Sequence, residues 1–260
     1  MAQLGTFGDV AVDLDPADHV ATAEIRRAPN NFFDKTLIAS LADAFEALDA
    51  NPDCRAIVLC SEGKHFCAGA NFGGGDPGIG GPGRHLYDEA VRLFSTKTPV
   101  VAAVQGAAIG GGLGLALMPD FRVASPEARF SANFARLGFH HGFGLTVTLP
   151  RVVGPQKALE LLYLGARLSG EEALAIGLCD RLAAPDRVRE EAHALAAEIA
   201  VSGPLAIASI RETMRAGLAD QIRIATDREK AEQDRLEKTE DFREGIAAMA
   251  ERRTPRFRGR

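Results

Sequence analysis

The chain of 260 residues has few cysteines, and its four cysteines form neither a C-x-x-C pair nor another spacing typical of a metal site. We therefore predict no metal centre. Cys54 and Cys60 flank or lie within an apolar run, which is typical of buried thiols. Unpaired buried thiols fit a reducing compartment, so we expect a cytoplasmic protein.

Long apolar runs are also missing. No uninterrupted stretch approaches the roughly 18 residues of a membrane span, and the first residues lack the basic and apolar regions of a signal peptide. The formal net charge is −5, whereas general nucleic-acid binders carry a basic excess. These absences predict a protein that acts on neither membranes nor nucleic acids.

Positive charge gathers only in the C-terminal tail, which contains Arg252, Arg253, Arg256, Arg258 and Arg260. A solvated chain end is the commoner explanation of such a run. The other explanation is a docking site for a ligand that carries phosphate, because arginine binds phosphate bidentately. The composition of the tail leaves both explanations open.

Strand-like and helix-like segments alternate through most of the chain. Apolar or alternating patterns predict strands at 10–14, 19–25, 56–60, 100–104, 120–124, 128–131 and 178–182. Helical periodicity predicts helices at 34–50, 87–96, 156–164, 170–175, 188–199, 204–218, 220–238 and 240–251. This order indicates an α/β body followed by helices. We expect residues 1–200 to form the body and residues 201–260 to form a helical extension.

The most informative segment is PVVAAVQGAAIGGGLGLALM at 99–118. A β-branched run ends in small residues, and the glycines at 110–112 then open an apolar helical pattern. Glycines at such a turn expose backbone N–H groups at a helix start, which favours an anion or a developing oxyanion. The alternative is that they only allow a helix and a strand to pack closely. No carboxylate stands between 113 and 118.

Three stretches carry a family resemblance. Residues 57–71, IVLCSEGKHFCAGAN, are similar to a strand followed by a CAGAD loop. Residues 99–124 are similar to a PVIAAVNGxAxGGGxxLAxxxD segment, and residues 130–154 match the segment that follows it. With the RRTPRF tail at 252–257, and in this order, they resemble the crotonase superfamily, which is the enoyl-CoA hydratase/isomerase family. The resemblance spans nearly the whole chain.

The resemblance implies a fold and a substrate. The fold is an α/β crotonase-like spiral of ββα repeats with a C-terminal helical trimerisation region, so we expect a homotrimer or homohexamer. The substrate is an acyl-CoA thioester, and no cofactor is expected beyond the coenzyme A of that substrate. The thioester carbonyl would lie between the backbone N–H groups of Ala70 and Gly111, an oxyanion hole that stabilises an enolate. Glycine at 111 suits this role because it lets a ligand approach the main chain.

Further substrate contacts follow from the same resemblance. Arg252 matches the family's basic position near the 3′-phosphate of coenzyme A. Asn31 lies in the segment near adenine and pantetheine, although a turn before a helix is the simpler explanation. Asn71 replaces the usual aspartate of the CAGAD loop, a mild change. The predicted substrate-binding residues are Asn31, Phe32, Ala68, Asn71, Gly110, Gly114, Asn133, Phe134, Gly142 and Arg252.

The chain departs from the family at the positions that would supply carboxylic acids. The two hydratase glutamates correspond to Gly114 and Phe134, and the acid of related isomerases corresponds to Gly142. None of these residues can move a proton. Hydration needs a water activated between carboxylates, so the sequence argues against a hydratase and favours an isomerase, a lyase or an atypical hydrolase.

Two histidines are the candidates for acid–base catalysis. His140 and His141 precede the vacated position 142, and histidine titrates near neutral pH. His141 is the better candidate because it adjoins that position. The alternative is that one ring faces solvent and the other bonds a backbone carbonyl. His85 and Tyr87 are secondary candidates, since they follow a glycine-rich loop that covers the acyl pocket in the family.

Two other functions compete with an enzyme of this family. A non-catalytic acyl-CoA-binding protein would keep the pocket without the acids. A nicotinamide-dependent oxidoreductase is disfavoured, because Gly110, Gly112 and Leu115 break the G-x-G-x-x-G/A pattern of a dinucleotide site.

Overall fold

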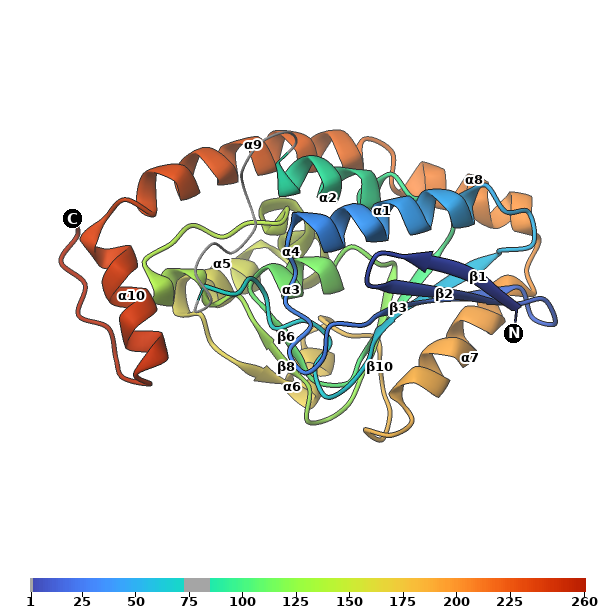
Figure 1. Cartoon of the computed structure of the whole chain (residues 1–260), viewed down its shortest axis with the longest axis horizontal. Helices are drawn as coiled ribbons and strands as arrows, with labels where there is room; N and C mark the ends of the chain where they lie inside the picture. The colour runs from blue at the N-terminus through green and yellow to red at the C-terminus, as the bar shows by residue number, and fades with distance from the viewer. Residues whose placement is uncertain (1, 73–84) are drawn as a thin grey trace.

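The computed structural model describes residues 2–72 and 85–260, and its centre is a seven-stranded sheet (Figure 1). The strand order is β1-β2-β3-β4-β5-β7-β10. The first three strands pair antiparallel, and the pairings from β3 to β10 are parallel. The strands are β1 (Ala2–Phe7), β2 (Val10–Asp15), β3 (Val20–Ile25), β4 (Ala56–Ser61), β5 (Val100–Val104), β7 (Phe121–Ala124) and β10 (Arg181–Leu182).

Helices cover both faces of this sheet because its central strands are apolar on both sides. Every residue of β4 and β5 is buried, and alternate residues of each strand belong to two separate hydrophobic cores. Helices α1 (Lys35–Asp49) and α2 (Leu86–Phe94) cover one face, and α7 (Val188–Ala200) covers the other (Figure 1). The two-residue period of a strand thus turns one continuous apolar run into a layer with two buried faces.

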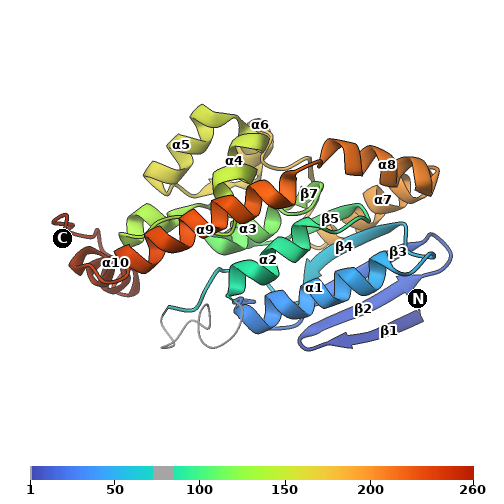
Figure 2. The ribbon, with the colours of Figure 1, turned by 90° about the horizontal axis from the view of Figure 1, so that it is seen from above.

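A second, three-stranded sheet in the order β6-β8-β9 and the remaining helices complete the molecule. Helix α9 runs beside α2 and α4, and α10 packs on the 3₁₀ helix η1 (Figure 2). These elements are β6 (Ala107–Ile109), β8 (Arg129–Ser131), β9 (Leu168–Ser169), α3 (Gly111–Ala116), η1 (Asn133–Leu137), α4 (Leu145–Val153), α5 (Pro155–Leu164), α6 (Gly170–Ala175), α8 (Pro204–Met214), α9 (Leu218–Leu236) and α10 (Glu240–Ala250).

Most of the predicted elements are confirmed, and the strands predicted at 10–14 and 19–25 pair antiparallel as β2 and β3. The sequence does not predict β1, β6 or β9: β6 and β9 have only three and two residues, and β1 contains Gly5, where its pairing with β2 shifts register. The single helix expected at 204–218 ends at Met214, and α9 begins at Leu218. Gly217, the N-cap residue of α9, has a φ of 71°, a left-handed conformation that glycine adopts readily. The division of the chain at residue 200 stays a prediction.

Helix α8 is held to the body mainly by charged side chains. Arg211 donates from Nε to Asp120 at 2.9 Å and from Nη1 to the carbonyl of Thr96. Arg215 donates to the other oxygen of Asp120 at 3.0 Å. The Arg211 side chain is only 8 % exposed and that of Asp120 17 %, so these ion pairs are shielded from solvent. They fix the position of a helix that buries little of its apolar surface.

The apolar side chains of α8 face outward. Leu205 is 87 % exposed and Ile210 is 59 % exposed. No single helix in the described part of the chain is long and apolar enough to cross a bilayer, and only α7 and α8 taken together, bent by 105°, pass that test.

Candidate acyl-thioester site

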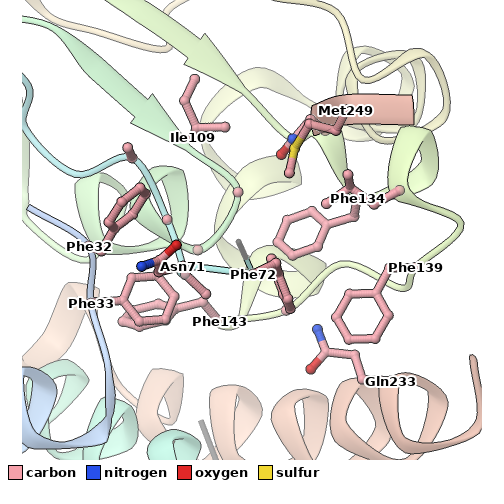
Figure 3. Close-up of a pocket in the computed structure, with 18 of the residues that line it drawn as sticks. Phe32, Phe33, Asn71, Phe72, Ile109, Phe134, Phe139, Phe143, Gln233 and Met249 are labelled. Carbon is pink, nitrogen blue, oxygen red and sulfur yellow. The ribbon is translucent and has the colours of Figure 1, made fainter. Parts of the chain in front are cut away.

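One cavity of about 380 Å³ gathers segments that are far apart in the sequence (Figure 3). Its volume lies in the range of small-molecule sites. Its wall comes from the loops after β3 and β4, from α2, the β6–α3 turn, the η1 region and helices α9 and α10. Nine of the predicted site residues line it: Phe32, Ala68, Ala70, Asn71, Gly110, Gly111, Asn133, Phe134 and Gly142. The motifs quoted above thus converge on one cavity.

Two of these residues carry backbone N–H groups that no other described residue uses. Cys67 N–H donates to the Ala107 carbonyl at 2.8 Å, and Ile109 N–H donates to the Cys67 carbonyl at 3.1 Å. These bonds tie the loop after β4 to β6. Neither the Ala70 nor the Gly111 N–H donates to an acceptor in the described part of the chain. The cavity therefore has two main-chain donors available for a ligand.

Glycine is required at two positions of the β6–α3 turn because other atoms fill the space of a side chain. A Cβ on Gly111 would collide with the Phe33 ring, and a Cβ on Gly112 would collide with the carbonyl oxygen of Cys67. Close packing therefore explains the lack of a side chain at both positions, and the role of Gly111 as an oxyanion donor stays a prediction. Gly111 in addition lines the cavity, where it keeps the main chain bare.

Other side chains fill the space at two of the three vacated acid positions. A Cβ on Gly114 would lie 2.6 Å from Cβ of Phe143. A Cβ on Gly142 would collide with the Tyr87 hydroxyl and would lie 2.6 Å from Nε2 of Gln233. Gly114 itself does not line the cavity, contrary to its prediction as a substrate contact, because Phe143 lies in front of it. An acid cannot return to either position unless these neighbours move.

Tyr87 and Gln233 form a polar pair in the cavity wall. The Tyr87 hydroxyl donates to Oε1 of Gln233 at 2.7 Å, and Nε2 of Gln233 donates to the His140 carbonyl at 3.0 Å. The two side chains are 8 % and 7 % exposed. Burial raises the pKa of Tyr87, so its hydroxyl keeps the proton that it donates. No sequence signal identifies Gln233, which meets Tyr87 across 146 residues.

His140 and His141 are not among the described residues that line the cavity, so their role in acid–base catalysis stays a prediction. His140 donates from Nδ1 to the His141 carbonyl at 2.8 Å, and the two rings stack. His141 donates from Nε2 to the Thr146 hydroxyl at 2.8 Å, which in turn donates to Glu229 at 2.6 Å. Buried Glu229 also accepts from the Gly144 and Thr146 N–H groups and so holds this loop against α9. The ring of His141 is thereby directed into this hydrogen-bonded chain.

The burial of His141 makes stability depend on pH. Burial, together with the neighbouring charge of His140, lowers the pKa of His141 from 6.5 to about 4. Between these values the unfolded chain binds a proton that the folded chain does not, so stability falls as the pH drops from 6.5 towards 4. The shift corresponds to about 3 kcal/mol.

We expect His141→Gln to remove most of this dependence, because glutamine takes up no proton. Urea unfolding of both proteins at about pH 7 and about pH 4.5 measures it. The wild type should lose about 2.4 kcal/mol more unfolding free energy between the two conditions than the variant loses, because the full effect of the pKa shift is reached only below pH 4. Equal losses would show that another group controls this pH range.

Asn31 lies outside the cavity wall and is fully buried. Its amide nitrogen donates to the carbonyls of Glu62 and His65 at 2.9 and 2.6 Å, and its Oδ1 accepts from the Arg27 N–H at 3.0 Å. The φ of Asn31 is 48°. The residue therefore shapes the loop before α1, as the turn explanation expects. Its predicted contact with the substrate does not involve the wall of this cavity.

Arg252 also stands outside the cavity wall, one turn beyond the α10 residues Met249 and Ala250, which do line it. It is exposed and has a φ of 55°. Its neighbour Arg253 pairs with Glu244 at 2.5 Å. Part of the basic tail is thus neutralised within the chain, and a contact of Arg252 with coenzyme A stays a prediction.

Comparisons with known proteins agree with this geometry. Residues 17–260 match the family model described as enoyl-CoA hydratase/isomerase. A probable enoyl-CoA hydratase of Bacillus subtilis is 33 % identical over 259 residues, which cover 96 % of this chain and 99 % of that protein. The 1,2-epoxyphenylacetyl-CoA isomerase of Escherichia coli is 29 % identical over 238 residues, which cover 88 % of this chain and 91 % of that protein.

Solved structures give the same result. The crystal structure of an enoyl-CoA hydratase/isomerase from Pseudoalteromonas atlantica T6c has a TM-score of 0.87 and 29 % identity, and the match covers 96 % of this chain and 100 % of that one. An enoyl-CoA hydratase from Mycobacterium avium subsp. paratuberculosis has a TM-score of 0.83 and 28 % identity, over 96 % and 99 % of the two chains. With the crotonase fold and its C-terminal helices in place, the chain belongs to the enoyl-CoA hydratase/isomerase family and is an acyl-CoA enzyme of that family.

Proposed function

We propose that the protein stabilises the enolate of an acyl-CoA thioester at the Ala70 and Gly111 N–H groups, and that it acts as an isomerase, lyase or hydrolase but not as a hydratase. One observation carries the proposal. Two unused main-chain donors lie at a cavity in which other side chains occupy the acid positions 114 and 142. Donors placed where negative charge develops are the main catalytic device of such sites.

The cavity wall limits which chemistry the protein itself performs. Among the described residues that line the cavity there is no aspartate, glutamate or histidine. Its polar side chains are Asn71, Tyr87, Asn133, Arg167 and Gln233, which orient a ligand rather than exchange protons at neutral pH. Of the three reaction types, a lyase reaction depends least on a proton-transfer side chain in the cavity wall. When the bond between the α-carbon and a carboxylate breaks, carbon dioxide leaves, the electron pair is delocalised onto the thioester oxygen as an enolate, and a proton from water then adds to the α-carbon, so no protein base is needed.

Two measurements on the wild-type protein test the proposal. We expect a bound 3-ketoacyl-CoA to show the ultraviolet absorbance of its enolate, because the two N–H groups favour the charged form. We expect crotonyl-CoA to bind without loss of its enone absorbance. Hydration of crotonyl-CoA with a kcat of order 1 s⁻¹ or more, a typical enzymatic rate, contradicts the proposal.

A non-catalytic acyl-CoA-binding protein is the second candidate. The lack of a proton-transfer side chain on the described wall favours it. A panel of acyl-CoA esters distinguishes the binding protein from the enzyme. Esters that bind without enolate absorbance and without turnover support the binding protein, whereas turnover of any member supports the enzyme.

We also propose that α8 joins subunits in a homotrimer or a homohexamer, because its apolar side chains lie exposed on the single chain. We expect Leu205→Asp to dissociate the assembly, since burying an unpaired carboxylate costs several kcal/mol. Sedimentation velocity measures the change. Leu4→Asp is the matched control, because Leu4 is 46 % exposed on strand β1. A wild-type monomer that binds acyl-CoA contradicts this assembly.

A further inference from the structure

Aromatic rings from distant parts of the chain line the cavity (Figure 3). Phe72 packs edge-to-face against Phe139 and Phe242, with ring centroids 6.0 and 5.9 Å apart. Phe33 lies 5.6 Å from Phe143. Rings that hold one another in this way form a stiff wall, and a planar aromatic guest adds further edge-to-face contacts. The phenylalanines on the wall are Phe32, Phe33, Phe72, Phe134, Phe139 and Phe143.

The buried amide in this wall, that of Gln233, has hydrogen-bonding capacity left over. Gln233 offers two amide hydrogens and two acceptor sites. The Tyr87 hydroxyl uses one acceptor site, and the His140 carbonyl uses one hydrogen. The second Nε2 hydrogen has no partner in the described part of the chain. Since the Gln233 side chain is 7 % exposed and lines the cavity, a ligand in the cavity is positioned to accept it.

The position of this amide depends on glycine at position 142, which corresponds to the acid of related isomerases. A side chain at Gly142 would displace the Tyr87 hydroxyl and crowd Nε2 of Gln233. A side chain at Gly114 would likewise displace the Phe143 ring. Because these two positions are glycines, the Phe143 ring and the Gln233 carboxamide occupy space that acidic side chains would otherwise fill. Figure 3 shows Gln233 across the cavity from Phe32.

We propose that the acyl group of the substrate is aromatic and carries an oxygen substituent on its ring, and that Gln233 donates its free Nε2 hydrogen to that oxygen. Tyr87 is the positioning residue, because its hydroxyl fixes which way the amide points. The inference rests on the proposed function, which seats the thioester carbonyl at Ala70 and Gly111. A straight acyl chain leaves the buried amide hydrogen unpaired, which lowers its affinity.

Calorimetric titration with 4-hydroxyphenylacetyl-CoA, phenylacetyl-CoA and octanoyl-CoA tests the proposal without requiring turnover. We expect the hydroxylated ester to bind roughly fivefold to tenfold more tightly than phenylacetyl-CoA, the effect of one net hydrogen bond. We expect octanoyl-CoA to bind more weakly than either. Gln233→Met should bind the two aromatic esters with equal affinity. Tyr87→Phe should reduce the ratio between the affinities of the two aromatic esters. Lys230→Met, an exposed change on the same helix, should keep the wild-type preference.

The outcomes separate this inference from the proposed function. If no ester binds, the proposed function fails. If all three esters bind to the wild type with equal affinity, or octanoyl-CoA binds most tightly, the aromatic inference fails while the function stands. If Gln233→Met keeps the full preference for the hydroxylated ester, the amide is not the recognition group. Thermal unfolding of each variant shows whether it is folded. If Gln233→Met does not fold, the ester preference of Tyr87→Phe is the result that tests the inference.

Discussion

Gly112→Ala is expected to lower the ratio of enolate to ketone in a bound 3-ketoacyl-CoA by roughly 10²–10³-fold, the effect of losing one oxyanion donor. The added methyl group would collide with the carbonyl oxygen of Cys67. That carbonyl accepts the Ile109 N–H in the bond that ties the loop carrying Ala70 to the strand leading to Gly111. Pushing the two segments apart separates the two donors. The measurement is the enolate absorbance at saturating ligand.

A matched glycine shows whether the effect is local. Gly203 has a φ of −58°, and a Cβ on it would lie 3.8 Å from the Ala206 side chain, which is an ordinary van der Waals contact. Gly203→Ala should therefore leave the enolate absorbance unchanged. Wild-type absorbance in a folded Gly112→Ala protein would show that the spacing of the two segments does not control the bound enolate. Circular dichroism confirms the folded state of both variants.

Gly114→Ala is expected to lower the free energy of unfolding by about 3 kcal/mol, at the upper end of the cost of overpacking a core. The new Cβ would lie 2.6 Å from Cβ of Phe143, which cannot move without its backbone. Phe143 has a φ of 62°, an uncommon conformation for a bulky residue, and it is 1 % exposed. The crowded atoms therefore have little room to relax. Urea unfolding measures the loss.

A double-mutant cycle with Phe143→Gly isolates the contact. Once Phe143 has no side chain, Gly114→Ala should be neutral or stabilising by up to about 1 kcal/mol, because alanine favours a helix over glycine. The coupling between the two positions is then about 3 kcal/mol. If the cost of Gly114→Ala is the same in both backgrounds, Phe143 is not what excludes a side chain from position 114.

Hydrophobic patterns in the sequence predicted much of the fold, because in the central strands such a pattern extends over several residues. The apolar runs of β4 and β5 and the amphipathic pattern of α1 lie where periodicity places them. Elements without a period were missed, such as the two-residue strand β9, whose pairing with β8 depends on a distant segment. The sequence predicts a break between the last helices at residue 219, whereas α8 ends at Met214 and α9 begins at Leu218, because a helical pattern does not fix where a helix ends.

The sequence by itself determined the family, the glycine turn and the absence of acids at Gly114, Phe134 and Gly142, because these are matters of residue identity at motif positions. Only the tertiary structure decided what replaced those acids. Tyr87 and Gln233 meet across 146 residues, and His141 points into a hydrogen-bonded chain because Glu229 holds its loop. Side-chain direction depends on packing between distant helices, and no local pattern in the sequence encodes it.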